Sequence, residues 1–364
     1  MVIEPAENRQ PVRASPGKFP SCHQSGIALI YVLLIFLLIT TVASEIVMNL
    51  WLHTEKNARY LERTQAKHYA LGAEQYVAWL LEQDFQQDKK NNRMVDHENE
   101  LWNVETINYD VEQGVIELHV QDEQSRFNLN WLADDSKPSG EQRAERGGSP
   151  AVQMFENLLT VQSMDQQLAD NIARWMNKEQ KSVSRGTEDQ VYLSLVPPRR
   201  TGQTEMTSVS ELILIDGFNN EEVEKLLPYI TVIPRSSKMN MNTALPEVIR
   251  SLNKNISEGD ALMIINRRGD AGLSNIEELN QLVALSGKAG IFNERNQNER
   301  VVFDSQYFSA RIKATFRETT FYLKTIFYRS SEGHVQVIGR EIGPGQYWAP
   351  ANKADLTGNS GANK

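Results

Sequence analysis

The sequence predicts an α+β fold in which a long N-terminal helix packs on an antiparallel sheet, and a large all-helical insert interrupts that sheet. Three observations support this prediction. An uncharged apolar run at residues 27–44 continues without proline into an amphipathic helical pattern. Strand patterns occur both early and late in the chain. The long stretch between them has helical periodicity instead.

The long helix is expected to run from Ile27 to about Asp84, which is roughly 85 Å at the helical rise per residue. Its first part, residues 27–44, has the length and composition of a transmembrane helix. No proline occurs between Pro20 and Pro138, so the sequence offers no strong helix breaker there. The amphipathic part repeats apolar residues at spacings of three and four: Val47, Leu50, Trp51, Ala58, Leu61, Tyr69, Gly72, Ala73, Tyr76, Val77 and Leu80.

The first 26 residues are polar, with three basic and two acidic residues, and are expected to form a leader on the cytoplasmic side. This leader ends in Ser25-Gly26. A cut after Gly26 would leave Ile27 as the new N-terminus and would keep the apolar run. The alternative is a secretory signal that is cut near Ala43. We favour the first interpretation because the helical pattern continues past Ala43 without a break.

Two clusters of strand patterns are expected to form one sheet. The early cluster, at 106–112 and 115–121, alternates in polarity and is joined at Gln113-Gly114, which is a hairpin signal. Each cluster alone would be a marginal sheet of two or three strands, so we expect the late strands to complete the early hairpin. The late segments are β-branched and aromatic, with Gly333 in the turn before the last: 308–316, 320–328 and 335–342.

The stretch between the strand clusters is expected to be a helical insert, preceded by a linker rich in Gly, Pro and charge. A polar loop at 86–100 is expected to follow the long helix. Apolar spacing marks insert helices around Phe155–Leu159, Leu168–Trp175, Glu221–Tyr229, Leu245–Leu252 and Ile276–Leu285. The expected division of the chain is leader 1–26, transmembrane segment 27–44, helix and first strands 45–132, linker 133–150, insert 151–296, last strands 297–343 and disordered tail 344–364.

Composition excludes several classes of function. The chain has 364 residues and a net charge of −9, which disfavours a general nucleic-acid binder. Its one cysteine, Cys22, precedes the apolar run, so the main body has no thiol for a disulfide, a Cys-ligated zinc or thiol catalysis. The six histidines show neither metal-ligand spacing nor a neighbouring nucleophile motif. We therefore expect a protein that is not an enzyme.

Five short motifs stand out, in this order: Gly26 followed by Ile27-Ala28-Leu29, Tyr69-Ala70-Leu71-Gly72-Ala73-Glu74, Arg126-Phe127-Asn128-Leu129-Asn130, Thr207-Ser208-Val209-Ser210-Glu211-Leu212 and Asn240-Met241-Asn242-Thr243-Ala244. Together they resemble the K-type minor pseudopilin of the bacterial type II secretion system (general secretion pathway protein K), over nearly the whole chain. The first motif looks like a prepilin peptidase site. The resemblance implies a pilin-like body of helix and sheet that carries a large helical insert.

The function that this resemblance implies is structural. The chain would cap the tip of the secretion pseudopilus and help to initiate its assembly, for export of folded proteins across the outer membrane. Its implied partners are the I- and J-type minor pseudopilins, the pseudopilus shaft and prepilin peptidase, with no nucleic acid. Its implied location is the bacterial inner membrane, crossed once, with most of the chain in the periplasm.

Tyr31 is the fifth residue after Gly26, where most pilin-like subunits carry Glu and the resembled family does not. A carboxylate inside a bilayer costs about 2.5–3.5 kcal/mol unless a partner neutralises it. In a fibre, that partner would be the free amine of the subunit ahead. A subunit with none ahead gains nothing from the charge, so Tyr31 fits the outermost position. Any apolar residue suits a membrane helix equally well, and this simpler explanation stays open.

The resembled family has an acidic calcium-binding loop where this chain has residues 177–190. Glu188 and Asp189 match its Gly-Ala-Glu-Asp, and Asn177 and Glu179 occupy the place of an Asp-x-Asp. Calcium prefers six to eight oxygen ligands. The amide at position 177 and nearby Lys and Arg side chains lower the expected affinity, so a solvated polar loop is the alternative.

The segments 209–229 and 256–285 look like helix-hairpin-helix modules, which bind DNA in other proteins. Their turn at Gly217-Phe218-Asn219 lacks the second glycine, and residues 151–295 carry 15 basic and 19 acidic residues, the wrong sign for phosphate. We expect them to pack against protein. The alternative function is a bitopic periplasmic adaptor that binds secreted cargo through the insert. The faces of the insert are expected to carry Trp175, Phe218 and Tyr229 among mixed charge.

Overall fold

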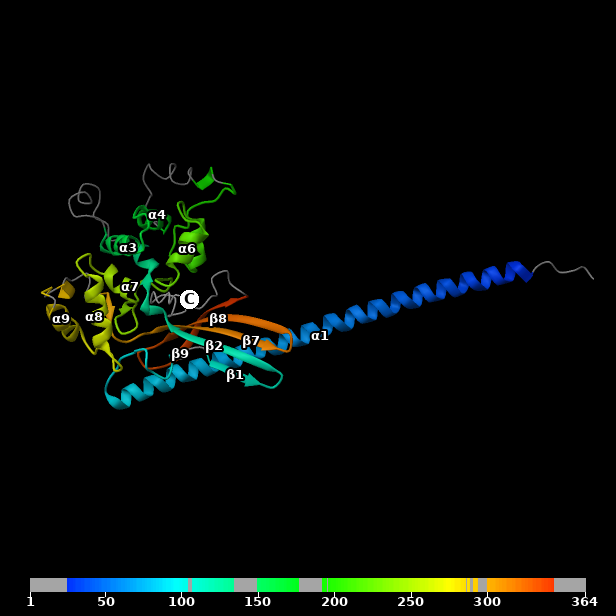
Figure 1. Cartoon of the computed structure of the whole chain (residues 1–364), viewed down its shortest axis with the longest axis horizontal. Helices are drawn as coiled ribbons and strands as arrows, with labels where there is room; N and C mark the ends of the chain where they lie inside the picture. The colour runs from blue at the N-terminus through cyan, green and yellow to red at the C-terminus, as the bar shows by residue number, and fades with distance from the viewer. Residues whose placement is uncertain are drawn as a thin grey trace, which may run out of the picture. The chain divides into compact units, whose positions relative to one another are not determined.

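The structure is a computed structural model that describes residues 25–103, 107–133, 149–176, 192–194, 196–285, 287–288, 291–293 and 300–343 (Figure 1). Most of the expected linker and the whole expected tail lie outside these ranges. The chain divides into two compact units, residues 1–61 and 62–364. The described part of the first unit is helix, and the second unit holds the sheet and the insert.

The N-terminal helix α1 spans Ser25–Asn91, so the predicted helix is present. The predicted end near Asp84 and the predicted loop from residue 86 were wrong by about two turns. Phe85 is buried four residues after Leu81, and the polar residues 86–91 that follow it are helical too. The helix stops where Asn92 adopts a positive φ of 51°, a conformation that commonly ends helices. Lys89 and Lys90 lie in its last turn, where their positive charges interact favourably with the negative end of the helix dipole.

The five-stranded sheet has the order β1-β2-β7-β8-β9, and every neighbouring pair is antiparallel. Early β2 pairs with late β7, which confirms that the C-terminal strands complete the N-terminal hairpin. Gln113 occupies the turn of that hairpin with a φ of 58°. The strands span Ile107–Val111 (β1), Gly114–Asp122 (β2), Tyr307–Phe316 (β7), Thr319–Arg329 (β8) and Val335–Ile342 (β9).

One face of this sheet packs on the second half of α1, as Figure 1 shows. The helix contributes small residues at three- and four-residue spacing, Ala66, Ala70 and Ala73, which let the sheet approach its backbone closely. Leu118, Ile312 and Leu323 meet them from three adjacent strands. This cluster is the core of the pilin-like body.

The insert has its own core, built from the segments between β2 and β7. Figure 1 places its α-helices together at one end of the sheet. The helices span Pro150–Val161 (α3), Gln167–Met176 (α4), Asn220–Leu226 (α6), Pro246–Ser251 (α7), Glu258–Arg268 (α8) and Ile276–Leu285 (α9). Short 3-10 helices lie at Glu123–Ser125 (η1), Leu129–Ala133 (η2), Val209–Leu214 (η3) and Ile291–Asn293 (η4).

The insert is not all-helical, and that prediction needs correction. Two-residue strands form two parallel pairs, β3 with β4 and β5 with β6. These pairs are too short to leave an alternating pattern in the sequence. Their bounds are Phe127–Asn128 (β3), Ile230–Thr231 (β4), Met239–Asn240 (β5) and Val301–Val302 (β6).

Candidate functional site

The predicted membrane segment forms the start of α1. Gly26 and Ile27 lie in its first turn, so the predicted cleavage point is within continuous helix. The large apolar side chains from Ile27 to Val42 are each about half to two-thirds exposed. Among the described residues, this is the helix long and apolar enough to cross a membrane, with a mean hydropathy of 2.7. The segment therefore fits a single-pass anchor.

Tyr31 lies within this apolar segment, and its side chain is 63 % exposed. Ile30 and Val32 beside it are exposed to a similar degree. The position is therefore available to lipid or to a neighbouring helix, as a fibre contact requires.

The four predicted calcium ligands, Asn177, Glu179, Glu188 and Asp189, lie outside the described residues. Calcium binding stays a prediction.

An exposed aromatic patch lies where α1 passes the hairpin strand β1. We define it by Tyr76, Trp79 and Tyr109. Tyr76 stacks on Trp79 with ring centroids 5.9 Å apart, and Tyr109 meets Tyr76 edge-on at 5.8 Å. Trp79 nevertheless keeps 52 % of its surface exposed. Aromatic side chains held in place by one another while exposed are typical of protein interfaces. The sequence pattern did not reveal this patch because Trp79 lies outside the apolar repeat.

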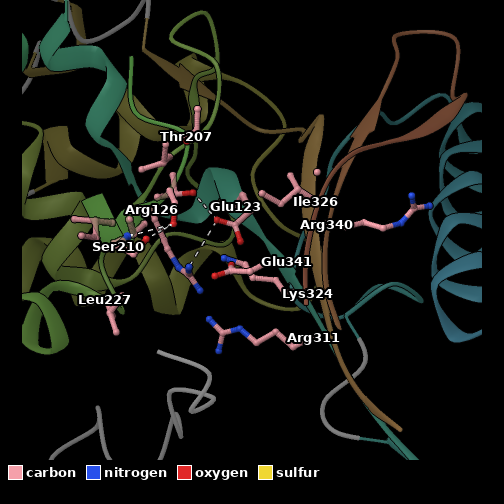
Figure 2. A pocket seen from close by; sticks show the side chains of 16 residues that line it. Glu123, Arg126, Thr207, Ser210, Leu227, Arg311, Lys324, Ile326, Arg340 and Glu341 are labelled. Carbon is pink, nitrogen blue, oxygen red and sulfur yellow. Dashed lines mark hydrogen bonds and ion pairs between the residues drawn. The ribbon is translucent and has the colours of Figure 1, made fainter. Parts of the chain in front are cut away.

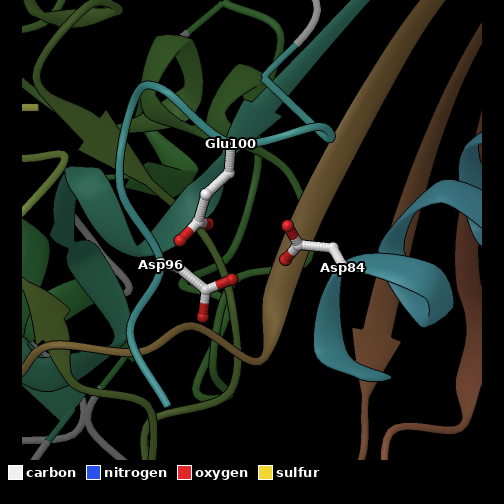
Figure 3. A group of neighbouring side chains, drawn as sticks. All are labelled: Asp84, Asp96 and Glu100. Carbon is white, nitrogen blue, oxygen red and sulfur yellow. The ribbon is translucent and has the colours of Figure 1, made fainter. Parts of the chain in front are cut away.

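A cluster of three acidic side chains forms where α1 ends (Figure 3). Asp84 comes from α1, and Asp96 and Glu100 come from the segment after it. Figure 3 shows the three carboxyl groups directed toward one another, with oxygen atoms from each lying within 4.8 Å of the others. Asp84 and Asp96 are buried, and Glu100 is nearly so. Three like charges this close and this buried repel one another strongly.

Arg329, from the end of β8, is a cation that contacts two members of this cluster, Asp84 and Asp96. Its Nη1 donates to Asp84 at 3.2 Å, and its Nη2 binds the carboxylate of Asp96 and the carbonyl of Ser305. Glu100 instead accepts a 2.6 Å hydrogen bond from the indole nitrogen of Trp102. Through these contacts, Arg329 joins the last part of α1 to the end of strand β8.

Burial and neighbouring carboxylates set the protonation of the cluster. Burial, then repulsion from Asp84 and Asp96, raises the pKa of Glu100 to about 9. Burial and Asp96 raise the pKa of Asp84 to about 7, although Arg329 opposes the shift. The cluster therefore holds protons at neutral pH. Asp84 and Glu100 also line a cavity together with His97, whose Nε2 lies 3.3 Å from a carboxylate oxygen of Glu100.

Two of the sequence motifs, at residues 126–130 and 240–244, supply buried asparagine side chains that make several hydrogen bonds. The side-chain amide of Asn240 donates to Asp96, Asp122 and Ser305, at 3.0, 3.1 and 2.9 Å. That of Asn130 donates to the carbonyl of Met206 at 3.1 Å. These amides join the insert to the sheet and to its own loops. Their role is structural, because buried polar groups require partners.

The helix-hairpin-helix segments are also protein-packing elements. Ser208 and Glu211 form a capping box at η3, and Asn219 and Glu222 form one at α6. The aromatic residues expected on the faces of the insert are buried instead. Trp175, Phe218 and Tyr229 are only 4, 8 and 8 % exposed, respectively. The expectation that they lie on the faces of the insert was therefore wrong, because they fill its core.

Comparison with known families finds two matching sequence models. Both describe protein K of the type II secretion system, and they match residues 125–235 and 239–302. The matched ranges cover the insert, including three of the five motifs.

Several proteins that carry the name type II secretion system protein K are similar to this chain. That of Pseudomonas aeruginosa is 28 % identical over 340 residues, which are 91 % of this chain and 97 % of that protein. That of Klebsiella pneumoniae is 30 % identical over 228 residues, covering 62 % of this chain and 68 % of that protein. The crystal structure of the GspK-GspI-GspJ complex from enterotoxigenic Escherichia coli matches with a TM-score of 0.67. It is 20 % identical and covers 80 % of this chain and 99 % of the other, which establishes a shared fold.

Proposed function

Because the chain belongs to the protein K family of the type II secretion system, we propose that it is the minor pseudopilin that caps the tip of the pseudopilus. In this role it also helps to initiate pseudopilus assembly for export of folded proteins across the outer membrane. It would be held in the bacterial inner membrane by α1, with the rest of the chain in the periplasm. Its role is structural rather than enzymatic.

The position of the insert supports the tip assignment. Residues 123–306 lie between β2 and β7, and their helices gather at one end of the sheet (Figure 1). A subunit within a fibre has neighbours along the axis on both sides. Such a bulky insert is tolerable only where the fibre ends. Tyr31 is consistent with the same position, because a subunit with none ahead has no amine to pair with a glutamate.

The aromatic patch supports assembly with other minor pseudopilins, and it is the observation on which the proposal most depends. Tyr76, Trp79 and Tyr109 lie on the helix-and-sheet body rather than on the insert. We propose that I- and J-type pseudopilins, such as those in the complex named above, contact this body. A stable interface there should bury more than about 1,000 Å².

The alternative is a bitopic adaptor that binds secreted cargo through its insert. The aromatic side chains expected on the faces of the insert are in its core, so they offer cargo no contact surface. Leu262 on α8 is an exposed apolar residue of the insert, with 45 % of its surface accessible. It therefore makes a matched counterpart to Trp79 for an experiment that separates the two functions.

The experiment is to co-express the full-length chain with I- and J-type pseudopilins, purify it in detergent and measure the mass of the complex. We expect all three proteins at a fixed ratio, without cargo. Trp79→Ser should lower the recovery of the partners several-fold, and Leu262→Ser should leave it unchanged. If the chain stays alone, and Leu262→Ser instead abolishes capture of a secreted protein, the adaptor function is correct.

We also propose that Asn177, Glu179, Glu188 and Asp189 bind calcium, as the family resemblance implies. All four side chains offer oxygen ligands, which calcium prefers. Calcium should raise the Tm of the full-length chain relative to a chelator. Paired Glu188→Gln and Asp189→Asn substitutions should remove that rise. An identical Tm with calcium and with chelator would contradict the proposal.

A further inference from the structure

A cavity of about 490 Å³ lies between the insert and the face of the sheet that points away from α1 (Figure 2). The sheet side is a row of charged cross-strand neighbours, Arg311 on β7, Lys324 on β8 and Glu341 on β9. The insert side contributes Glu123, the first residue of η1, and Arg126, which follows η1 directly. The cavity therefore brings charges of both signs together at a partly enclosed site.

Positive charge predominates in this cavity. Arg311 and Lys324 lie directly opposite each other on antiparallel strands, and like charges in such pairs are destabilising. Arg126 adds a third cation, and Figure 2 shows its guanidinium pointing toward that of Arg311. Arg340 also lines the cavity, but its guanidinium turns away to bind Glu74 on α1. Two carboxylates, those of Glu123 and Glu341, balance three cations.

Arg126 has hydrogen-bonding capacity that the described residues leave unused. Its side chain is only 6 % exposed. Its Nη1 lies 3.7 Å from the carboxylate of Glu123, whereas its Nε has no hydrogen-bond partner in the described part of the chain. Leaving a buried charged donor unpaired is costly. Burial, followed by repulsion from Arg126, lowers the pKa of Arg311 to about 10, so the protein environment opposes the charge on this second guanidinium too.

We propose that this cavity binds a small oxyanion of the phosphate or sulfate class between the guanidinium groups of Arg126 and Arg311. A guanidinium presents a planar fork of donors that matches two oxygen atoms of such an anion. The bound anion would pair the unused donor of Arg126 and relieve the repulsion among the three cations. Because Arg126 belongs to the insert and Arg311 to the sheet, the anion would also fasten the insert to the pilin-like body.

The test is thermal unfolding of the full-length chain in detergent, with sodium chloride replaced by sodium phosphate at constant ionic strength. Binding to the folded state alone raises the Tm in a saturable way. We expect a rise of several degrees in phosphate, and a similar rise in sulfate. Line broadening of the ³¹P signal of phosphate by the protein, reversed by sulfate, reports binding without unfolding.

Arg311→Met should abolish both the rise in Tm and the line broadening. Lys313→Met is the matched control, because Lys313 lies two residues along β7 on the same face and pairs with Glu117 at 2.7 Å, outside the cavity. Arg311→Lys keeps the positive charge but loses the fork of donors, and should weaken the phosphate effect several-fold. A wild-type chain with the same Tm in phosphate and chloride, or equal phosphate effects in wild type and both Arg311 variants, would overturn the proposal.

Discussion

The carboxylate of Glu74 on α1 accepts two hydrogen bonds from the guanidinium of Arg340 on β9, at 2.7 and 2.8 Å. The same carboxylate accepts a third from the hydroxyl of Thr325, at 2.7 Å. Burial alone would raise the pKa of Glu74, but these hydrogen bonds outweigh it and lower the pKa. One side chain thus fastens the long helix to two strands, including the edge strand of the sheet.

Glu74→Gln should therefore destabilise the body by about 1 kcal/mol, because the buried amide would offer the half-exposed guanidinium of Arg340 one acceptor oxygen in place of two. Urea unfolding at neutral pH measures the change. Glu332→Gln is the control, since the Glu332 side chain is 82 % exposed. Equal stability of the Glu74 and Glu332 variants would mean that the pair contributes nothing to the fold.

The acidic cluster makes stability depend on pH. The folded-state pKa of Glu100, about 9, and that of Asp84, about 7, lie above their ordinary values. The folded state therefore binds more protons than the unfolded state, and stability falls as pH rises through these values. We expect these two groups to lower the free energy of unfolding progressively from about pH 4, near their ordinary pKa values, to about pH 9.

Glu100→Gln should flatten this decrease, because the amide keeps an oxygen for Trp102 and carries no charge to repel Asp84 and Asp96. Denaturant unfolding at several pH values gives the slope. Glu277→Gln on the exposed surface of α9 should keep the wild-type slope. A wild-type slope in the Glu100 variant would show that this carboxyl does not take up the proton.

Two features of the turn between β8 and β9 require glycine at position 333, its backbone conformation and the lack of room for a side chain. Its φ is +91°, and a Cβ there would lie 2.2 Å from a ring carbon of Phe85. Gly287 has a φ of +74° with nothing within 4 Å of such a Cβ. Gly287→Ala should cost about 1–2 kcal/mol for the left-handed conformation. Gly333→Ala should cost a further ~1–3 kcal/mol for overpacking, measured by the same unfolding assay.

If the Gly333 and Gly287 variants lose equal stability, the phenyl ring moves aside at no cost. A second substitution, Phe85→Leu in the Gly333→Ala background, checks the reason. It should recover part of the loss, because a smaller side chain leaves room for the added methyl group.

Prepilin peptidase should cut after Gly26 and leave Ile27 as the mature N-terminus. The unbroken helix across residues 25–91 supports this expectation, because a cut there retains the whole apolar segment. Mass spectrometry of the membrane fraction identifies the terminus. Gly26→Val should block the cut and leave the leader attached. A mature chain that begins at Ser44 would instead identify a secretory signal and contradict the pilin-like assignment.

Tyr31→Leu should leave secretion near the wild-type level, because the proposed tip position has no partner that depends on the side chain. Tyr31→Glu should reduce the number of initiated fibres. A carboxylate in the bilayer costs about 2.5–3.5 kcal/mol, and no subunit ahead would neutralise it. Secretion of a reporter and fibre counts by electron microscopy measure both variants. Equal results for Leu, Glu and wild type would remove the physical reason for placing Tyr31 at the tip.

The sequence by itself determined the features that depend on local patterns. The apolar run, the long helix, the hairpin at Gln113-Gly114 and the late strands follow from periodicities of 3.6 and 2 residues. The completion of one sheet from two distant clusters also followed, because neither cluster is stable alone. Helix α1 ran further than expected, because residues 86–91 at its end are polar and leave no apolar repeat in the sequence.

Only the tertiary structure decided which charged and aromatic side chains meet. Asp84 and Arg329 are far apart in the chain, and their ion pair exists because the last part of α1 lies beside the end of strand β8. Trp175 was expected on an outer face of the insert and instead fills its core, whereas Trp79 stays exposed on α1. A periodic pattern specifies which face of an element is apolar. What covers that face depends on the packing of elements distant in sequence, and this packing sets burial, charge and the candidate binding surfaces.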